Sequence, residues 1–207
     1  MKIDIWSDVI CPFCYIGRVN LETAIREAGL EPVIVHHAFR LMPGEAPYPV
    51  EEMFVRRYGQ TPQQAQATIA GTEAAAAQAG LTFRLQGTLV GDTADAHTLL
   101  AFAGEKAPDL LQRMYFAYFT QGRNLFDREV LVELAVEVGL DRLLSEGAFD
   151  FTSLKARVEA DQKQAQGFGV KGVPFFVFDD RTAVSGAHPP SAFLKAFKAI
   201  ADNHAAP

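Results

Sequence analysis

The sequence predicts an α/β fold in which a βαβ unit and a ββα unit are separated by a large all-helical insertion. Three observations support this prediction. Two apolar, strand-like segments near the start enclose a helix-forming segment. Residues 51–167 are almost entirely helical in pattern, and an intensely apolar strand with a hairpin turn precedes the last helix. The 207 residues suffice for one domain with such an insertion.

The first unit, residues 1–50, contains the elements of a βαβ motif. A short strand is expected at residues 2–6, and the helix after it carries apolar residues at helical spacing and ends at Gly29. A second strand is expected at residues 33–39. Its run of β-branched residues predicts burial on both faces, as parallel sheets require. The proline-rich stretch that follows should lack regular structure.

The second unit, residues 51–167, is predicted to be helical. Thr61 and Gln64 form a capping box around Pro62, at the start of an alanine-rich helix that extends towards Gly80. Further helices are expected over residues 94–105, 108–121, 127–138, 141–145 and 152–166.

The third unit, residues 168–207, begins in a glycine-rich stretch. Its expected elements are a strand at residues 173–178, a turn at 179–181, a strand at 182–185 and a final helix that starts at Pro189 and Pro190.

The composition argues against several classes of partner. An apolar content of 49% with 21% charged residues is ordinary for a globular protein. The net charge of −6, without a basic stripe, argues against nucleic acid. No run is long enough to span a membrane, and the first residues lack the apolar core of a secretory signal. We therefore expect a cytoplasmic protein without a membrane partner; the sequence does not determine its oligomeric state.

A CxxC motif, Cys11-Pro12-Phe13-Cys14, holds the only two cysteines and lies where the first strand meets the first helix. With Cys11 at the N-cap, Pro12 takes the first helical position, where its missing N–H costs nothing. The amides of the first turn should then point at the Cys11 sulfur and lower the pKa of its thiol. Cys14 lies one turn on, close enough to form a disulfide. This arrangement predicts thiol–disulfide exchange, with Cys11 as nucleophile and exposed, and Cys14 as the buried resolving thiol.

Other roles for these cysteines are weaker. A structural disulfide across so short a loop would constrain the unfolded chain little, and two buried apolar thiols are a further alternative. A zinc site would need two more ligands, and the adjacent His36 and His37 would point to opposite faces of a strand. We expect no metal site, with His36 packed in the strand, His37 towards solvent, and His97 on a helix face without a catalytic role.

Further motifs occur over nearly the whole chain. Besides residues 7–17 around the CxxC motif, they lie at residues 92–97, 124–127, 172–175 and 185–189. In this order they resemble the DsbA family, and within it the FrnE-like cytoplasmic branch. The order of the three units and the position of the CxxC motif correspond to a thioredoxin-like fold with a helical insertion.

The resemblance implies a protein disulfide oxidoreductase that acts on protein or small-molecule thiols and disulfides. It implies a cis peptide bond before Pro174, with this proline facing the active-site cysteines. Pro12, Phe13, Val173 and Pro174 are then the expected substrate-binding residues. No cofactor is expected beyond the redox-active pair, with glutathione as a possible reductant.

Two alternative functions belong to other classes. Kappa-class transferases and 2-hydroxychromene-2-carboxylate isomerases share such folds and use glutathione, but they carry serine in place of the first cysteine. A non-catalytic, chaperone-like binding module would require neither Cys11 nor Cys14. The intact CxxC motif favours the oxidoreductase.

The residues between the cysteines predict the redox potential. DsbA carries histidine where this chain has Phe13, so the chain offers no such donor to a Cys11 thiolate. We expect a potential clearly below the roughly −120 mV of DsbA and nearer the value of about −270 mV for thioredoxin. Equilibration with glutathione buffers measures it. A potential at or above that of DsbA would contradict this interpretation of the site.

Overall fold

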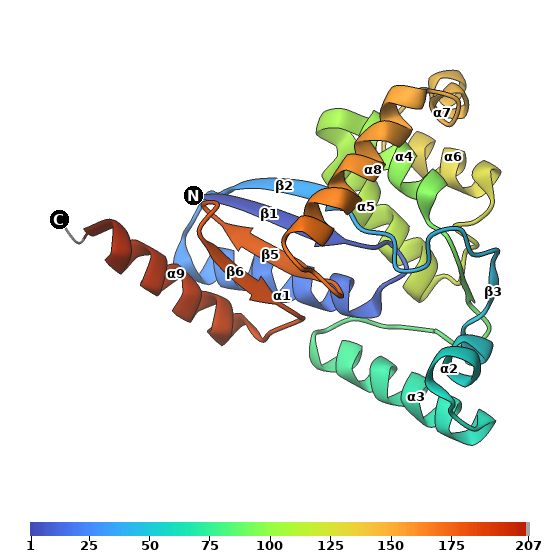
Figure 1. The fold of residues 1–207 in the computed structure, drawn as a ribbon, viewed down its shortest axis with the longest axis horizontal. Coiled ribbons are helices and arrows are strands. Elements are labelled where there is room, and N and C mark those ends of the chain that lie inside the picture. The colour runs from blue at the N-terminus through green and yellow to red at the C-terminus, as the bar shows by residue number, and fades with distance from the viewer. Residues whose placement is uncertain (206–207) are drawn as a thin grey trace.

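The computed structural model describes the backbone of residues 1–205, and it shows a four-stranded sheet covered by helices on both faces (Figure 1). The strand order is β2-β1-β5-β6. These strands span Val33–Ala38, Lys2–Ser7, Phe175–Phe178 and Thr182–Ser185. The predicted α/β fold with a helical insertion is confirmed.

Strand β1 lies inside the sheet and connects the N-terminal βαβ unit with the C-terminal ββα unit. It pairs in parallel with β2 and antiparallel with β5, where Ile5 lies opposite Phe176. The β5–β6 hairpin turns at Asp179 and Asp180, which both have positive φ, a conformation that aspartate tolerates better than most residues. Because side chains alternate along a strand, β1 contributes to a separate core on each face of the sheet.

Helices α1 (Pro12–Ala28) and α9 (Pro190–Ala205) lie side by side on one face of the sheet (Figure 1). The core between them includes Leu21, Phe176 and Phe193, all at most 1% exposed. Helix α8 (Thr152–Gly167) covers the opposite face, where Trp6, Phe39 and Ala165 are buried together.

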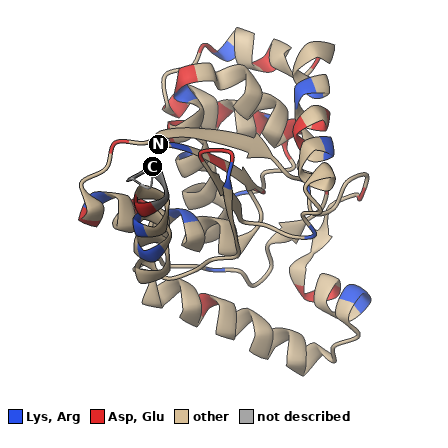
Figure 2. Ribbon diagram, turned by 60° about the vertical axis from the view of Figure 1, so that its left-hand side comes forward, with Lys and Arg blue, Asp and Glu red and all other residues tan. Residues whose placement is uncertain are grey.

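The inserted helices form a third and larger core with the residues around the CxxC motif. The capping box of Thr61 and Gln64 is confirmed. Figure 2 shows acidic and basic residues interspersed over most helices, whereas α3 carries a single acidic band. The insertion contains α2 (Val50–Tyr58), α3 (Pro62–Gln78), α4 (Ala94–Ala103), a 3-10 turn (Gly104–Lys106), α5 (Ala107–Tyr115), a π-helical turn (Phe116–Thr120), α6 (Arg128–Glu137) and α7 (Arg142–Ala148), and it ends with α8.

The structure corrects two expectations for strands. Strand β2 is an edge strand that is not buried on both faces, and Val33 at its start is 66% exposed. The proline-rich stretch contains a two-residue strand, β3 (Tyr48–Pro49), which pairs antiparallel with β4 (Leu89–Val90). A proline is compatible with so short a strand because it lies at an edge, where no partner needs its missing N–H.

The sequence predicted that His37 faces solvent, and this prediction is wrong. The side chain instead binds α8 to the sheet. Its Nδ1 lies 2.9 Å from Asp161 Oδ1, and its Nε2 lies 2.8 Å from Asp4 Oδ1. The ring stacks on Trp6 at a centroid distance of 4.3 Å. Both ring nitrogens face carboxylates, so a protonated imidazole can donate to both. Burial acts to lower the pKa of His37, but the bonds to Asp161 and Asp4 outweigh it, and the pKa is raised.

The raised pKa of His37 predicts that stability falls as the pH rises above about 6.5. A group whose pKa is higher in the folded state stabilises the fold fully below its unfolded value, near 6.5, and this contribution is lost as pH rises through the folded value. His37→Ala should remove this pH dependence and lower the free energy of unfolding by about 3 kcal/mol at neutral pH, because it leaves Asp4 buried beside one lysine only.

Urea unfolding from slightly acidic to alkaline pH measures this dependence. His188→Gln, at an exposed histidine, is the matched control and should keep the wild-type profile. If His37→Ala retains that profile, the doubly paired imidazolium is not the source of the dependence.

Candidate active site

The turn from β1 into α1 positions the CxxC motif. The Cys11 N–H donates to the Asp8 carbonyl at 3.1 Å, and the Cys14 N–H donates to the Cys11 carbonyl at 3.0 Å. Cys11 is the N-cap residue and Pro12 follows at the first helical position, as predicted. The Cys11 side chain makes no capping hydrogen bond, so the expectation that the first amides point at its sulfur is wrong in this structure. The first-turn amide of Cys14 is instead used by the Cys11 backbone.

Both cysteines are free thiols and both are buried. Cys11 is 4% exposed and Cys14 is 2% exposed, so the prediction of an exposed Cys11 is wrong. The Val173–Pro174 segment explains the difference, because the Cys11 Sγ lies 3.5 Å from the Val173 carbonyl oxygen. Access to Cys11 therefore depends on the neighbouring loop as well as on its place at the helix end.

Cys14 lies deeper in the insertion core. Burial raises the pKa of the Cys14 thiol well above its usual value, and the neighbouring Cys11 raises it further. Tyr115 lies beside it, and burial together with the Cys14 charge raises the pKa of this phenol. Tyr115 stacks on Tyr15 with 4.9 Å between ring centroids. Such an environment keeps Cys14 protonated until the reaction removes the proton.

The peptide bond between Val173 and Pro174 is cis, which confirms the expectation taken from the resemblance. Pro174 is buried, and its carbonyl accepts the Gly186 N–H at 2.8 Å. The structure thus brings Cys11, Val173 and Pro174 together, although the first two are 162 positions apart.

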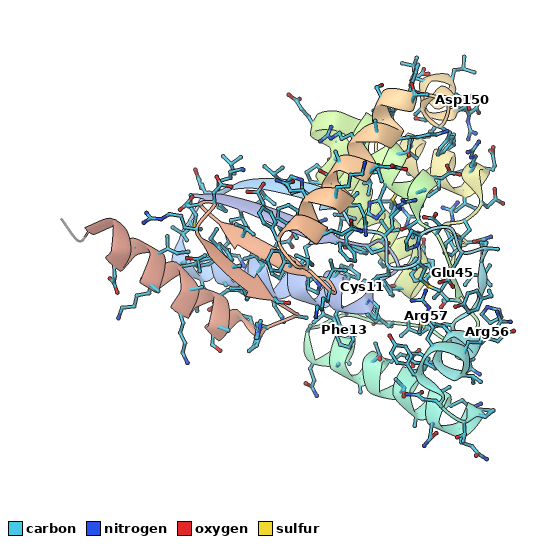
Figure 3. The ribbon with its side chains drawn as sticks, in the orientation of Figure 1. Cys11, Phe13, Glu45, Arg56, Arg57 and Asp150 are labelled. Carbon is cyan, nitrogen blue, oxygen red and sulfur yellow. The ribbon has the colours of Figure 1, made fainter. Side chains whose placement is uncertain are left out.

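The surface around Cys11 is apolar. Phe13 is 46% exposed and points away from the core, and Pro12 beside it is partly buried. Phe168 is 55% exposed and borders a groove that includes Lys171, Val173 and the buried Pro174. Figure 3 shows Cys11 and Phe13 at the N-terminal end of α1, where the sheet meets the insertion. An exposed aromatic ring within the CxxC motif, that of Phe13, suits the binding of unfolded or flexible chains.

Sequence reasoning missed two polar residues beside the motif. Asp8 is fully buried, and His97, expected on a helix face, is only 4% exposed. His97 Nε2 lies 3.5 Å from Asp8 Oδ1. Both belong to the motifs at residues 7–17 and 92–97, but no local pattern shows that these segments meet. No group of three or more His, Cys, Asp or Glu side chains among the described residues is placed to hold a metal ion.

Comparisons with known proteins agree with this geometry. The model of the DSBA-like thioredoxin domain family matches residues 2–198. The Bacillus subtilis protein YwbO, itself described as uncharacterized, is 29% identical over 211 residues, which cover 95% of each chain. A crystal structure of a probable DsbA oxidoreductase from Streptomyces coelicolor has a TM-score of 0.88 and 38% identity, and the match covers 95% of this chain and 88% of that one.

A more distant structure shares the fold. The cytosolic disulfide reductase DsbM from Pseudomonas aeruginosa, solved with GSH, has a TM-score of 0.68 at 18% identity, with 98% of this chain and 100% of that chain covered. These likenesses confirm the predicted thioredoxin-like fold with its helical insertion. Within the described part of the chain, none of the helices has the length and apolar character needed to cross a membrane.

Close packing at Gly17 predicts a sensitive position. A Cβ atom there would lie 3.0 Å from Pro174 Cγ and 3.3 Å from the Phe176 ring. Gly17→Ala should therefore lower the free energy of unfolding by about 1–3 kcal/mol. By displacing Pro174 and the adjoining Val173 carbonyl, it should also speed the alkylation of Cys11.

The matched control is Gly71→Ala on α3, where nothing lies within 4 Å of the added atom. This change should stabilise the helix by up to about 1 kcal/mol and leave Cys11 reactivity unchanged. Urea unfolding and the rate of alkylation distinguish the two variants. Equal effects of the two substitutions would show that the contact between Gly17 and Pro174 is unimportant.

Proposed function

Because this chain belongs to the family of DSBA-like thioredoxin domains, we propose that it is a protein thiol–disulfide oxidoreductase that uses Cys11 and Cys14 as its redox pair. The observation that carries the proposal is the placement of the two thiols on one helical turn, with the Cys11 Sγ 3.5 Å from the carbonyl of the residue before the cis proline. This geometry sets the Cys11 thiol against the segment at which a substrate would pair, with Cys14 more deeply buried behind it.

The proposed reaction has two exchange steps. The Cys11 thiolate attacks one sulfur of a substrate disulfide, which forms a mixed disulfide and releases the other substrate sulfur as a thiolate. The Cys14 thiolate then attacks the Cys11 sulfur, so that the substrate leaves with its second sulfur reduced. Two electrons pass to the substrate, and the chain is left with a Cys11–Cys14 disulfide. Run in reverse, the same steps oxidise a dithiol substrate.

The proposed substrate is an extended polypeptide segment with a cysteine or a disulfide. The Val173 backbone lies at the start of the segment that leads into β5, where a peptide can pair with it while its sulfur meets Cys11. Phe13 and Phe168, both exposed, provide apolar contacts that depend little on sequence. We further propose a cytoplasmic location and glutathione as a reductant; the reaction as written requires no other cofactor.

The reductive activity tests the proposal. Wild-type protein should accelerate the reduction of insulin by a thiol reductant, and Cys11→Ser should lose at least about 100-fold of this acceleration, because the hydroxyl cannot replace the attacking thiolate. Cys14→Ser should form mixed disulfides with substrates and release them slowly. Non-reducing gels followed by mass spectrometry identify the linked cysteine.

The two serine variants are isosteric controls for each other. Circular dichroism should show the same fold for both. Mixed disulfides that form through Cys14 in the Cys11→Ser variant would reverse the assigned roles. Insulin reduction that survives Cys11→Ser would instead favour a function without the redox pair.

A further inference from the structure

A cavity borders the open edge of β2, and the two exchange steps make no use of it. It lies between β2 and helices α4, α5 and α8, whose arrangement Figure 1 shows. Neither Cys11 nor Cys14 is among the described residues that line it. Its volume of about 270 Å³ lies just below the range of roughly 300–1,000 Å³ that is typical of small-molecule sites. The space therefore suits a compact ligand.

Helix α8 closes one end of this sheet edge and gives the cavity a buried, apolar wall. Ala38 and Val158 line it and are both buried. The Ala38 N–H donates to Asp161 Oδ2 at 3.0 Å, and the Arg40 N–H donates to Gln162 Oε1 at 2.6 Å. Because these side chains occupy the edge beyond the cavity, an extended peptide cannot pair along its whole length. A compact molecule with an apolar body fits better than a strand.

The backbone of β2 offers a hydrogen-bond donor to the cavity. The N–H groups of Val33 and Phe39 point away from it, because each donates at 3.0 Å to a carbonyl on the side of β1, that of Met1 or Ser7. Backbone N–H groups alternate in direction along a strand, so the even-numbered positions of β2 face the open edge. The N–H of His36, which lines the cavity, therefore points towards it.

Two imidazoles that line the cavity have a nitrogen without a hydrogen-bond partner. These atoms are His36 Nδ1 and His97 Nε2, and both are buried. Burial, with Arg18 and His37, lowers the pKa of His36 to about 3, so its ring is neutral and its Nδ1 can carry a hydrogen and donate. Because buried polar atoms usually have partners, polar atoms of a ligand or ordered waters are expected in this space.

The charged groups around the cavity favour an anion. Arg157 is exposed at its rim and makes no ion pair with the described residues; its guanidinium has one long contact, 3.5 Å to the Ala101 carbonyl. A guanidinium binds a carboxylate through two parallel hydrogen bonds. Asp161 is already paired with His37 and so is not free to pair with Arg157. Glu105, also exposed, is the one group at the rim that opposes an anion.

We propose that the cavity at the edge of β2 is a binding site for a small carboxylate with a compact apolar body. The carboxylate pairs with the Arg157 guanidinium and accepts the N–H and the Nδ1–H of His36. The apolar body packs against Ala38, Leu111 and Val158. The site is separate from the redox pair, and the proposal does not depend on the proposed function.

Titration of the ¹⁵N-labelled protein with benzoate, followed by amide chemical shifts, tests the proposal. The shifts should change at His36, Ala101 and Val158, which line the cavity. Benzamide and benzylamine, which carry the same ring without the negative charge, should bind at least about tenfold more weakly. Arg157→Gln should weaken benzoate by about tenfold or more, because it removes the charged half of the pair. Glu105→Gln should strengthen it by about two- to threefold, because it removes a repulsive charge.

The matched control is Arg181→Gln, which removes an exposed arginine from the β5–β6 turn and should leave benzoate binding unchanged. All three substitutions lie at exposed positions, so each variant should keep the wild-type spectrum outside its own surroundings. The proposal is overturned if neither benzoate nor the smaller isovalerate shifts the cavity amides at high millimolar concentration. It is equally overturned if Arg157→Gln and Arg181→Gln have the same effect. Preferred binding of benzylamine, weakened by Glu105→Gln, would show a site for cations instead.

Discussion

The antiparallel pairing of β1 with β5 is the constraint on which the active site depends. It sets Ile5 opposite Phe176 and leaves the Val173–Pro174 segment next to the end of β1, where α1 begins. Because buried backbone groups must find partners, this register cannot slip without exposing the phenylalanines of β5. The contact of 3.5 Å between Cys11 and the Val173 carbonyl, across 162 positions, is a consequence of that register.

The helical insertion is bound to the same sheet by charged groups rather than by apolar packing alone. Asp161 on α8 pairs with His37, and its carboxylate also accepts the Ala38 N–H at 3.0 Å. The carbonyl of Asp161 accepts the indole N–H of Trp6. Since α8 leads directly into the segment before Val173, these bonds fix both the insertion and the loop that covers Cys11.

Burial opposes the ionisation of the Cys14 thiol, and this is the main electrostatic constraint at the site. A buried thiol is slow to ionise, and Cys14 lies among aromatic rings that offer it no basic group. The same burial protects the resolving thiol from unrelated disulfides.

The sequence by itself determined the elements whose causes are local. The N-cap at Cys11, the capping box at Thr61 and the end of α1 at Gly29 follow from spacings of a few residues, and the order of the elements with the CxxC motif was enough for the fold. Only the tertiary structure decided that β2 is an edge strand, that His37 is paired with two carboxylates, that Cys11 is covered and that Asp8 meets His97. Each of these depends on residues brought together from distant segments, and burial and pairing are properties of the neighbours that a side chain acquires on folding, which its own local pattern does not encode.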